Sequence, residues 1–425
     1  MEMIGLVDGN NFYVSCERVF DLSLEGRPVA VLSNNDGCVI SRSYEFKALG
    51  IPMGTPYFKL RPRLQELGVV LRSSNYELYG DMSRRVIQTL QTFTTDVEQY
   101  SIDEAFVHID HAPGDDWRTL AAEIRARVFK WVGIPCGVGF ARSRTLAKIA
   151  NHIGKKRADG VFVMPDDPRP VLGGIPVGEV WGVGRRLTPK LAALGIFTAR
   201  QLAEADEPML IRRFGITLAR TARELRGESV IGHEDYAAES QSIACTRSFG
   251  HPVTELGDLR EAVAFYIARA AEKLRRERQR AAGANIFLQH YPTYADGGRG
   301  AVREEGGFAS TTVAFPQPTA ATGAMTAAAT PAVDALYVPG RRYKKAGVIF
   351  FGLEAADARQ PAFFTDTAAN DRAERAAAVM DRLNRLLGKG TVFSLAEGTD
   401  RPWSMKRDLL SRKYTTDWSE IPQIK

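Results

Sequence analysis

A short apolar run near the start of the chain ends abruptly on an acid. Residues 3–7 read Met-Ile-Gly-Leu-Val, and Asp8, Gly9 and two asparagines follow at once. A run of this length bounded by turn residues is typical of a buried strand, because helices usually need ten or more residues. The sequence therefore predicts a buried strand that delivers the carboxylate of Asp8 to its C-terminal end.

Strands and helices alternate from this run to about residue 165. The segment 97–110 alternates β-branched and aromatic residues, which indicates two strands around an adjacent Asp and Glu. The other elements predicted in this region are strands at residues 28–33 and 134–140 and helices at residues 117–132 and 145–153. Such interleaving favours an α/β or α+β core.

A Pro- and Asp-rich stretch at residues 165–170 marks a domain boundary. Beyond it the apolar residues have helical spacing, and glycines separate the predicted helices. Residues 228–242 are polar and poorly periodic, as expected of a linker. An Ala- and Thr-rich segment at residues 319–332 predicts a helix that is interrupted or kinked near Pro331. The other elements predicted beyond the linker are a strand from residue 243, a helix at 259–279 and strands at 284–291, 307–315 and 345–351.

Length and composition set outer limits on the class of protein. A chain of 425 residues corresponds to about two to four domains. A hydrophobic fraction of 44% and a charged fraction of 25% are ordinary for a soluble globular protein. The net charge of +6 favours a polyanionic partner only weakly.

Cysteine and histidine patterns exclude several kinds of site. The four cysteines have no CxxC spacing and the six histidines form no HExxH pair, so neither a zinc ribbon nor a disulfide framework is expected. No stretch approaches the roughly 20 apolar residues of a membrane span, and an acid interrupts the N-terminus where a signal peptide needs a long apolar run. We therefore expect a cytoplasmic protein with no membrane partner.

Three carboxylates are candidates for a metal site. Phosphoryl transfer depends on divalent metals about 3.5–4 Å apart, and magnesium requires hard oxygen ligands from separate segments. Asp8 and the adjacent Asp103 and Glu104 offer such ligands. Neighbours on a regular strand point to opposite faces, so both can reach one site only at a hairpin bend or bulge. By residue type alone, the pair could also be a charged β-turn.

Two motifs carry a resemblance to a known family. The opening segment Met-Ile-Gly-Leu-Val-Asp-Gly-Asn-Asn-Phe-Tyr resembles the first palm strand of Y-family DNA polymerases, and Tyr-Ser-Ile-Asp-Glu-Ala-Phe at residues 100–106 resembles the signature loop of that family. The resemblance covers essentially the whole chain. It implies that Asp8, Asp103 and Glu104 are the catalytic carboxylates and hold two Mg²⁺ ions, for which Mn²⁺ could substitute. The backbone carbonyl of Gly9 would add a ligand.

Tyr13 stands where the family carries the aromatic residue that selects the sugar. A ring packed under the deoxyribose leaves no room for a 2′-hydroxyl, so the resemblance implies a steric gate. Phe12 would line the same pocket or support Tyr13. Without the motif, a core tyrosine is the simpler interpretation.

The segment from Ser41 to Lys47 is expected to start a helix and to bind the triphosphate. Tyr44 and Lys47 are three residues apart and share a helical face. The family uses a matching tyrosine and a basic residue for this purpose, although many members have Arg, whose bidentate fork Lys47 lacks. Lys155, in a basic and acid-free segment, matches the lysine that reaches the incoming triphosphate. The alternative for these residues is a solvated surface.

Contacts to DNA are expected from two regions. The segment around Gly182 and Gly184 resembles a helix-hairpin-helix, in which backbone N–H groups approach a phosphate, although it could also be an ordinary helical turn. Residues 241–345 carry 14 Lys and Arg against 9 Asp and Glu, which agrees with phosphate binding. Arg247, in a segment that resembles the first little-finger strand, is the expected backbone contact.

The C-terminal region narrows the family to the UmuC type. Gln360, Phe363 and Phe364 belong to a segment that resembles the motif by which bacterial polymerases dock on the sliding clamp, although an apolar tail would look similar. The segments 401–407 and 414–418 resemble the C-terminal extension of UmuC-type polymerases. The implied partners are the sliding clamp, a dimer of a cleaved UmuD-type protein and RecA.

The resemblance implies an α+β, multidomain fold, a right-hand polymerase with palm, small fingers, helical thumb and a βαββαβ-like little finger. The expected domains are palm (1–11 and 75–165), fingers (12–74), thumb with helix-hairpin-helix (166–235), little finger (241–353) and clamp-binding motif with C-terminal extension (354–425). The implied activity is error-prone translesion synthesis on primer-template DNA from deoxynucleoside triphosphates. Its expected setting is SOS mutagenesis and DNA repair at the nucleoid.

Two other functions are compatible with parts of the sequence. A nucleotide cyclase also uses a palm-like fold and two metals, but the helix-hairpin-helix, the basic C-terminal unit and the clamp-like motif argue against it. A DNA-bound scaffold that blocks or recruits other polymerases would need no active site. Primer extension by the intact protein separates both from the polymerase.

Overall fold

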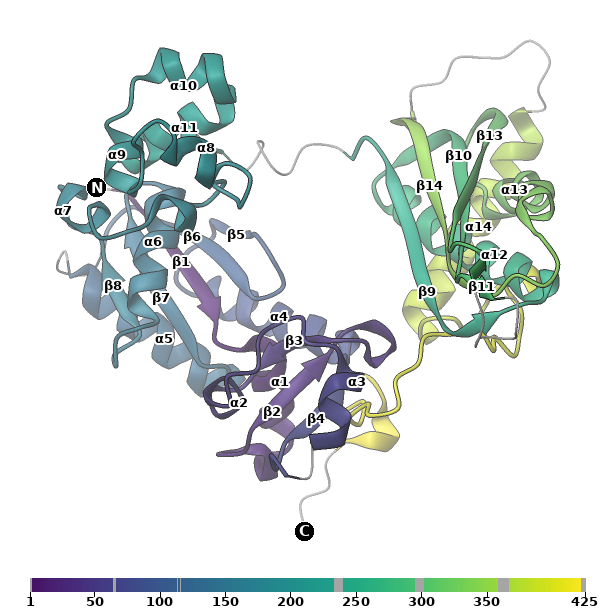
Figure 1. Cartoon of the computed structure of the whole chain (residues 1–425), viewed down its shortest axis with the longest axis horizontal. Helices are drawn as coiled ribbons and strands as arrows, with labels where there is room; N and C mark the ends of the chain where they lie inside the picture. Colours follow the sequence, from purple (N-terminus) through teal and green to yellow (C-terminus); the bar gives the residue numbers. More distant parts are fainter. Residues whose placement is uncertain are drawn as a thin grey trace. The chain divides into compact units, whose positions relative to one another are not determined.

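The computed structural model describes residues 2–63, 66–112, 114, 116–232, 240–294, 302–357 and 367–421. The chain forms two compact units, labelled by element in Figure 1. The first unit contains residues 1–33, 37–238 and 409–425, and the second contains residues 34–36 and 239–408.

A five-stranded sheet organises the first unit (Figure 1). Its strands follow the order β5 (Val97–Gln99), β6 (Glu104–Ile109), β1 (Met3–Gly9), β7 (Cys136–Ala141) and β8 (Val161–Val163). β1 lies in the middle, pairs antiparallel with both neighbours and is almost completely buried, as its apolar sequence predicts. The strands expected at residues 3–7, within 97–110 and at 134–140 are confirmed.

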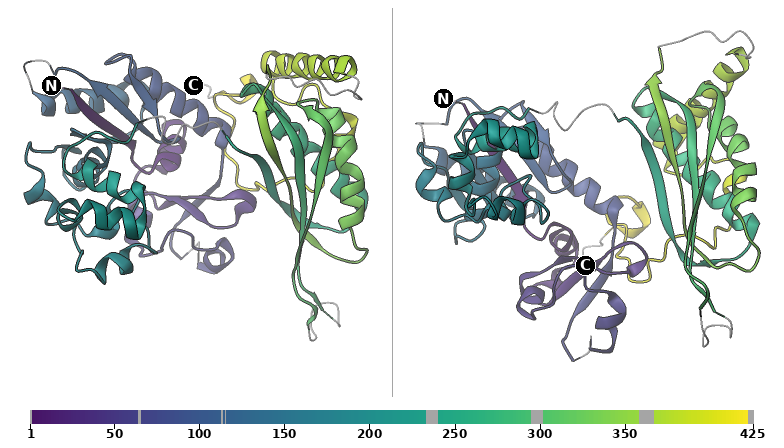
Figure 2. Two further views of the ribbon diagram at one scale, coloured as in Figure 1. Left: turned by 90° about the horizontal axis from the view of Figure 1, so that it is seen from above. Right: turned by 45° about the horizontal axis from the view of Figure 1, so that its top comes forward.

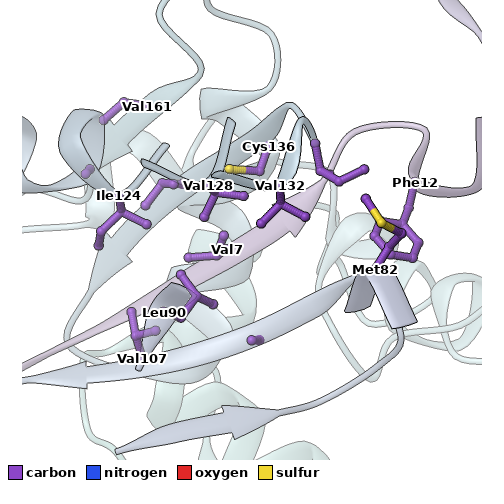
Figure 3. Close-up of a cluster of buried hydrophobic side chains, with 14 of the residues drawn as sticks. Val7, Phe12, Met82, Leu90, Val107, Ile124, Val128, Val132, Cys136 and Val161 are labelled. Atoms are coloured by element: carbon purple, nitrogen blue, oxygen red, sulfur yellow. The ribbon is translucent and has the colours of Figure 1, made fainter. Parts of the chain in front are cut away.

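Different helices cover the two faces of this sheet. Alternate residues of β1 point to opposite faces, so Val7 joins one core and Leu6 joins the other. Figure 3 shows Phe12 and Met82 of the first core lying together beside the end of β1. Asp8 follows the direction of Leu6 and emerges on the face that α6 covers. The helices packed on this sheet are α4 (Tyr76–Leu90), α5 (Trp117–Val132) and α6 (Arg144–Gly154), and α1 (Phe12–Phe20) packs beside α4.

A second, three-stranded sheet carries the elements predicted as fingers. β2 (Val29–Leu32) pairs antiparallel with β3 (Val39–Arg42) and parallel with β4 (Val70–Ser73). Two short helices, α2 (Tyr44–Ala48) and α3 (Tyr57–Leu60), complete this part. The Ser43 hydroxyl accepts the Phe46 N–H at 3.1 Å and so starts α2 where the sequence predicts a helix.

Five short helices follow the boundary at residues 165–170. Their apolar faces and those of α6 share one core, in which Leu191, Leu202 and Leu218 are buried. Thr198 and Gln201 form a capping box that starts the third of these helices. The helices are α7 (Arg169–Leu172), α8 (Thr188–Ala192), α9 (Ala199–Ala203), α10 (Glu207–Phe214) and α11 (Ile216–Leu225).

The second unit is built on a four-stranded antiparallel sheet with the order β13-β10-β14-β9. Helices α12 and α13 pack on one face of it, as Figure 2 shows. Its main elements follow the expected βαββαβ order: β9 (Ile243–Val253), α12 (Leu256–Arg276), β10 (Gln279–His290), β13 (Phe308–Thr319), α13 (Thr322–Leu336) and β14 (Tyr343–Ala355). A small hairpin of β11 (Thr293–Tyr294) and β12 (Val302–Glu304) extends from β10.

A helix that is interrupted or kinked near Pro331 is predicted from the sequence, and the structure shows one uninterrupted helix there. α13 runs through Pro331 to Leu336, although the proline has no N–H to donate within the helix. Met325, Ala329 and Val333 lie on one face of α13 and are buried in the core of the second unit. We attribute the continuity of the helix to this packing.

The C-terminal extension divides between the two units. α14 (Thr367–Leu387) is held in the second unit by two arginine pairs, Arg275 with Asp381 and Arg280 with Glu374, each at 2.7 Å. From Leu409 onward the chain belongs to the first unit. Among the helices of the described residues, none has the length and apolar character to cross a membrane.

Candidate active site

The hairpin between β5 and β6 bends at the acidic pair. Ser101 donates its backbone N–H to the Glu104 carbonyl at 3.0 Å, and Gly9 donates its N–H to the Asp103 carbonyl at 2.8 Å. Glu104 begins β6 and lies directly opposite Asp8 in the ladder. Directly opposed residues of an antiparallel pair point to the same face, so these two side chains are neighbours. The bend that a shared site requires is present.

The Ser101 side chain fixes this bend. Its hydroxyl donates a 2.6 Å hydrogen bond to a carboxylate oxygen of Asp103. The Ser101 hydroxyl oxygen in turn accepts the backbone N–H groups of Asp103 and Glu104 at 3.2 and 3.1 Å. A short hydroxyl suits this place because it donates and accepts at once. Asp103 is therefore held by a neutral partner.

The other two carboxylates pair with lysines from α6 and the residue that ends it. Lys155 Nζ lies 2.5 Å from Asp8 Oδ2, and Lys148 Nζ lies 2.8 Å from Glu104 Oε2. A spacing of seven residues returns both lysines to the same helical face. Gly137 on β7 leaves the space that Lys155 fills, because a Cβ there would lie 2.8 Å from the Lys155 Cγ.

Asp8 is in an unusual electrostatic environment. Burial raises the pKa of its carboxyl group to about 7, although the adjacent Lys155 ammonium lowers it, and the nearby Glu104 and Asp103 raise it further by repulsion. A concentration of like charge at a partly buried place favours the binding of a cation.

In the described part of the chain, no group of three or more His, Cys, Asp or Glu side chains stands close enough to hold a metal ion as it is. The carboxylates nonetheless supply the hard oxygen donors that Mg²⁺ prefers, from two separate segments. Asp8 and Glu104 each already hold a cationic ammonium group. The residues present therefore fit divalent cations once the lysines release the carboxylates.

A cavity of about 590 Å³ opens beside the carboxylates. Glu104 faces a second hollow of about 270 Å³, which also includes Asp8 and Lys155. Asp8 thus lies between the two spaces. The cavity brings together nine residues that the sequence assigned to metal or nucleotide: Asp8, Gly9, Phe12, Tyr13, Ser41, Tyr44, Lys47, Asp103 and Lys155.

Tyr13 forms a wall of this cavity as part of an aromatic cluster. Its ring stacks on that of Tyr79 with centroids 4.5 Å apart and planes within 14°. Tyr76 meets the Tyr13 ring edge-on at 6.0 Å. Phe12 also lines the cavity, and its side chain is largely buried in the core beside Tyr13. Burial raises the pKa of Tyr13, so its hydroxyl stays protonated.

Positive charge lines another part of the cavity. The Lys47 ammonium donates to Asn11 Oδ1 at 2.6 Å and lies 4.8 Å from the centre of the Tyr44 ring. Burial lowers the pKa of Lys47, and the nearby cations Arg42 and Lys155 lower it further. An anion bound among these three cations would relieve their mutual repulsion.

The residues expected to contact DNA are exposed or open to approach. Gly182 has a φ of 86°, which favours glycine, and Trp181 beside it donates its ring N–H to Tyr100 Oη at 3.2 Å. Within the described residues, a Cβ added at Gly184 would meet no atom within 4 Å, so internal packing does not require that glycine. Arg247 is exposed on β9 of the second unit. The clamp-motif residues Gln360, Phe363 and Phe364 lie outside the described residues.

Three further residues of the site were not assigned from the sequence. Lys148 belongs to the same face of α6 as Lys155, so the seven-residue spacing could have indicated it. Arg42 follows Ser41 on β3 and lines the cavity, which its position in the sequence alone does not reveal. Tyr79 supports Tyr13 from another helix, and no local pattern predicts that stack.

Comparison with protein families matches three parts of the chain. The family described as impB/mucB/samB matches residues 7–152, and its C-terminal domain matches residues 240–363. A domain of unknown function, DUF4113, matches residues 374–424. The first match includes the carboxylates and the tyrosine of the cavity.

Individual relatives agree with these matches. The chain is 44% identical over 429 residues to Protein UmuC of Salmonella typhimurium, with 100% of both chains covered. It is 31% identical over 294 residues to DNA polymerase IV 1 of Bacillus subtilis, covering 67% of this chain and 69% of that protein. A solved Y-family DNA polymerase chimera of Dbh and Dpo4 shares the fold, with a TM-score of 0.63 at 19% identity over 83% of this chain and 99% of the chimera. The chain therefore belongs to the impB/mucB/samB family, the UmuC-type translesion polymerases within the Y-family of DNA polymerases.

Proposed function

We propose that the chain extends a primer opposite damaged template bases by phosphoryl transfer assisted by two divalent metal ions. The observation that carries this proposal is the cavity of about 590 Å³ that Asp103, Tyr13 and Lys47 line together. A site for a deoxynucleoside triphosphate needs ligands for the metal ions that bind its phosphates. It also needs a wall that excludes a 2′-hydroxyl on the sugar, and cations that bind the triphosphate. The cavity offers all three.

The carboxylates would hold the metal ions. Asp8, Asp103 and Glu104 are the ligands we propose for two Mg²⁺ ions, with Mn²⁺ as a substitute and the Gly9 carbonyl as an additional ligand. Such ions activate an attacking hydroxyl and neutralise the charge of the triphosphate. The chain itself contributes the fixed bend at Ser101, which keeps Asp103 beside the cavity. No side chain has to act as general base, because positioning and electrostatics carry most of this chemistry.

The aromatic wall would select the sugar. Tyr13 is backed by Tyr79 at 4.5 Å, so its ring has little freedom to retreat from a bulkier ligand. A 2′-hydroxyl would therefore meet a supported ring. We propose that Tyr13 excludes ribonucleotides by this steric contact.

The cations would hold the triphosphate. Lys47 and Arg42 stand in the cavity wall, and the hydroxyls of Ser41 and Tyr44 lie beside them. Lys155 pairs with Asp8 in the structure, so it reaches the triphosphate only when that pair opens. The same movement would free Asp8 for a metal ion, which links nucleotide binding to assembly of the metal site.

Contacts to primer-template DNA would come from both units. We propose that the backbone near Gly182 and Gly184 approaches a phosphate, because the surface at Gly184 is open. Arg247 on the exposed surface of β9 would contact the backbone of the nucleic acid. The sliding clamp, bound through Gln360, Phe363 and Phe364, a UmuD-type dimer and RecA are the protein partners we propose. The setting would be the nucleoid during the SOS response.

Primer extension across a defined lesion tests this function. The full chain is incubated with Mg²⁺, deoxynucleotides and a primer-template that carries an abasic site, with and without a UmuD-type partner and RecA. We expect products longer than the lesion position when the partners are present. Cyclic nucleotide without extended primer would indicate a cyclase. No synthesis even with clamp, RecA and partner would indicate a scaffold.

A further inference from the structure

Residues 409–417, which we call the tail segment, pack within the first unit against residues from its N-terminal part. The Leu409 N–H donates to the Ser73 hydroxyl at 2.9 Å, and the Ser73 N–H donates to the Leu409 carbonyl at 3.0 Å. Tyr414 stacks on Phe20 of α1 with centroids 4.9 Å apart and planes within 8°. The tail segment lies within the residues matched by the domain of unknown function.

Asn75, at the start of α4, forms side-chain hydrogen bonds to the tail segment. Its Nδ2 donates to the Ser411 hydroxyl at 3.0 Å and to the Arg412 carbonyl at 3.3 Å. Its Oδ1 accepts the Leu78 N–H at 3.2 Å and so caps the helix. One side chain therefore both starts α4 and holds the tail segment. α4 is also the helix that carries Tyr79.

Glu17 joins the tail segment to Tyr79 inside the protein. Its side chain has no exposure to solvent, and its Oε1 accepts the Ser411 hydroxyl at 3.1 Å and the Tyr79 hydroxyl at 2.7 Å. Within the described residues, the other carboxylate oxygen has no hydrogen-bond partner. A buried carboxylate with so few donors is sensitive to the loss of any one of them.

Tyr79 connects Glu17 to the cavity, because its hydroxyl bonds to Glu17 and its ring stacks on Tyr13. It is completely buried, and Tyr13 stacks on it with centroids 4.5 Å apart. Two features locate the Tyr79 ring, its hydroxyl bond to Glu17 and its place in the core. Loss of the hydroxyl bond allows the ring to shift, and the ring of Tyr13 then loses its fixed support.

We infer that the tail segment, acting through Ser411, Glu17 and Tyr79, positions Tyr13 and thereby sets the discrimination between deoxynucleotides and ribonucleotides. This inference rests on the function proposed for the cavity. Ser411 and Glu17 are positioning residues, since neither lines the cavity that Tyr13 lines. Discrimination would therefore depend on a residue 394 positions away from Glu17 in the sequence.

Matched variants of the full chain test the inference. Ser411→Ala removes the donor to Glu17, Ser411→Thr keeps a hydroxyl, and Tyr79→Phe removes the second donor while keeping the ring. Ser419→Ala is the control, because among the described residues that exposed serine bonds within its own turn, to Asp417. Two readouts are measured: the fluorine NMR resonance of Tyr13 in fluorotyrosine-labelled protein, and the ratio of kcat/KM for a deoxynucleotide to that for the matching ribonucleotide.

We expect Ser411→Ala and Tyr79→Phe to move the Tyr13 resonance and to lower the ratio about threefold to tenfold, the range that one hydrogen bond supplies. Ser411→Thr should restore both readouts and Ser419→Ala should change neither. A Tyr13 resonance that stays fixed in folded Ser411→Ala would overturn the inference, and so would an unchanged ratio. The NMR readout needs no catalysis. Failure of every variant and of the original chain to extend a primer would therefore contradict the proposed function separately.

Discussion

The two sides of the cavity are held in different ways. On the carboxylate side, Asp8 and Glu104 pair with lysine side chains that are 30% and 17% exposed. On the tyrosine side, Tyr13 rests on Tyr79, which has no exposure to solvent and is fixed by an equally buried Glu17. Long, partly hydrated lysine side chains exchange partners easily, whereas a packed ring does not.

This difference indicates that the two sides of the cavity have different roles. The carboxylate side is arranged for exchange, since two of the three carboxylates that would bind metal ions, Asp8 and Glu104, are paired with ammonium groups that can leave. The tyrosine side is built before any ligand arrives, because its geometry comes from the core. Each of the following predictions concerns substitutions on one of the two sides of the cavity.

The largest effect is expected from the carboxylates. Replacing Asp103 with Asn and Glu104 with Gln removes the charge that would hold the metal ions, and single-turnover primer extension should fall by about 10³-fold or more. Thermal unfolding should change little, because both side chains are partly exposed. Synthesis that persists in a folded double variant would mean that the active site lies elsewhere.

Tyr13→Ala should damage selection more than catalysis. Removal of the ring opens space for a 2′-hydroxyl, so the preference for deoxynucleotides should fall by about 10²-fold, the upper range of shape-based discrimination. Incorporation of deoxynucleotides should be far less affected. The matched variant Tyr13→Phe keeps the ring and should retain the preference. An unchanged preference in the alanine variant would exclude Tyr13 as the gate.

Lys148→Met tests whether the carboxylate side is exchangeable. Methionine fills similar space without the charge that pairs with Glu104, so it removes a competitor for the metal ion. The Mg²⁺ concentration that gives half-maximal extension should fall by about twofold to fivefold, the range of a partly exposed ion pair. Lys130→Met, at an exposed position at the end of α5, is the control. A higher Mg²⁺ requirement would show that Lys148 assists the site instead.

The smallest effect concerns the pH dependence of stability. Burial raises the pKa of Glu17 above its ordinary value of 4.5. Stability from such a group is fully present below the unfolded pKa and is lost as pH rises through the folded pKa. Glu17→Gln has no such loss, so the Tm of the original chain minus that of the variant should fall as pH rises above about 4.5. A difference that is constant or grows with pH would contradict burial of an ionisable Glu17.

Local sequence patterns predicted much of the site. The apolar run before Asp8 and the alternation around Asp103 and Glu104 led to the two strands and the bend between them, because strand period and turn chemistry are local properties. The resemblance added Tyr13 and Lys155, which the structure brings to one cavity.

Contacts between distant segments could not be predicted in this way. The bond between Ser411 and Glu17 joins residues 394 positions apart, and no local pattern around either residue predicts the contact. Pairing of Lys148 with Glu104 depends on how closely α6 approaches the sheet, which is set by packing. The continuity of α13 through Pro331 likewise follows from burial of its apolar face.

A crystal structure with primer-template, Mg²⁺ and an unreactive deoxynucleotide tests the central claim most directly. We predict metal ions bound to Asp8, Asp103 and Glu104, with Lys155 and Lys148 moved away from their carboxylates. The stack of Tyr13 on Tyr79 should keep its separation of 4.5 Å. Lysines still paired with the carboxylates and metal ions bound elsewhere would contradict the account, and so would a rearranged tyrosine stack.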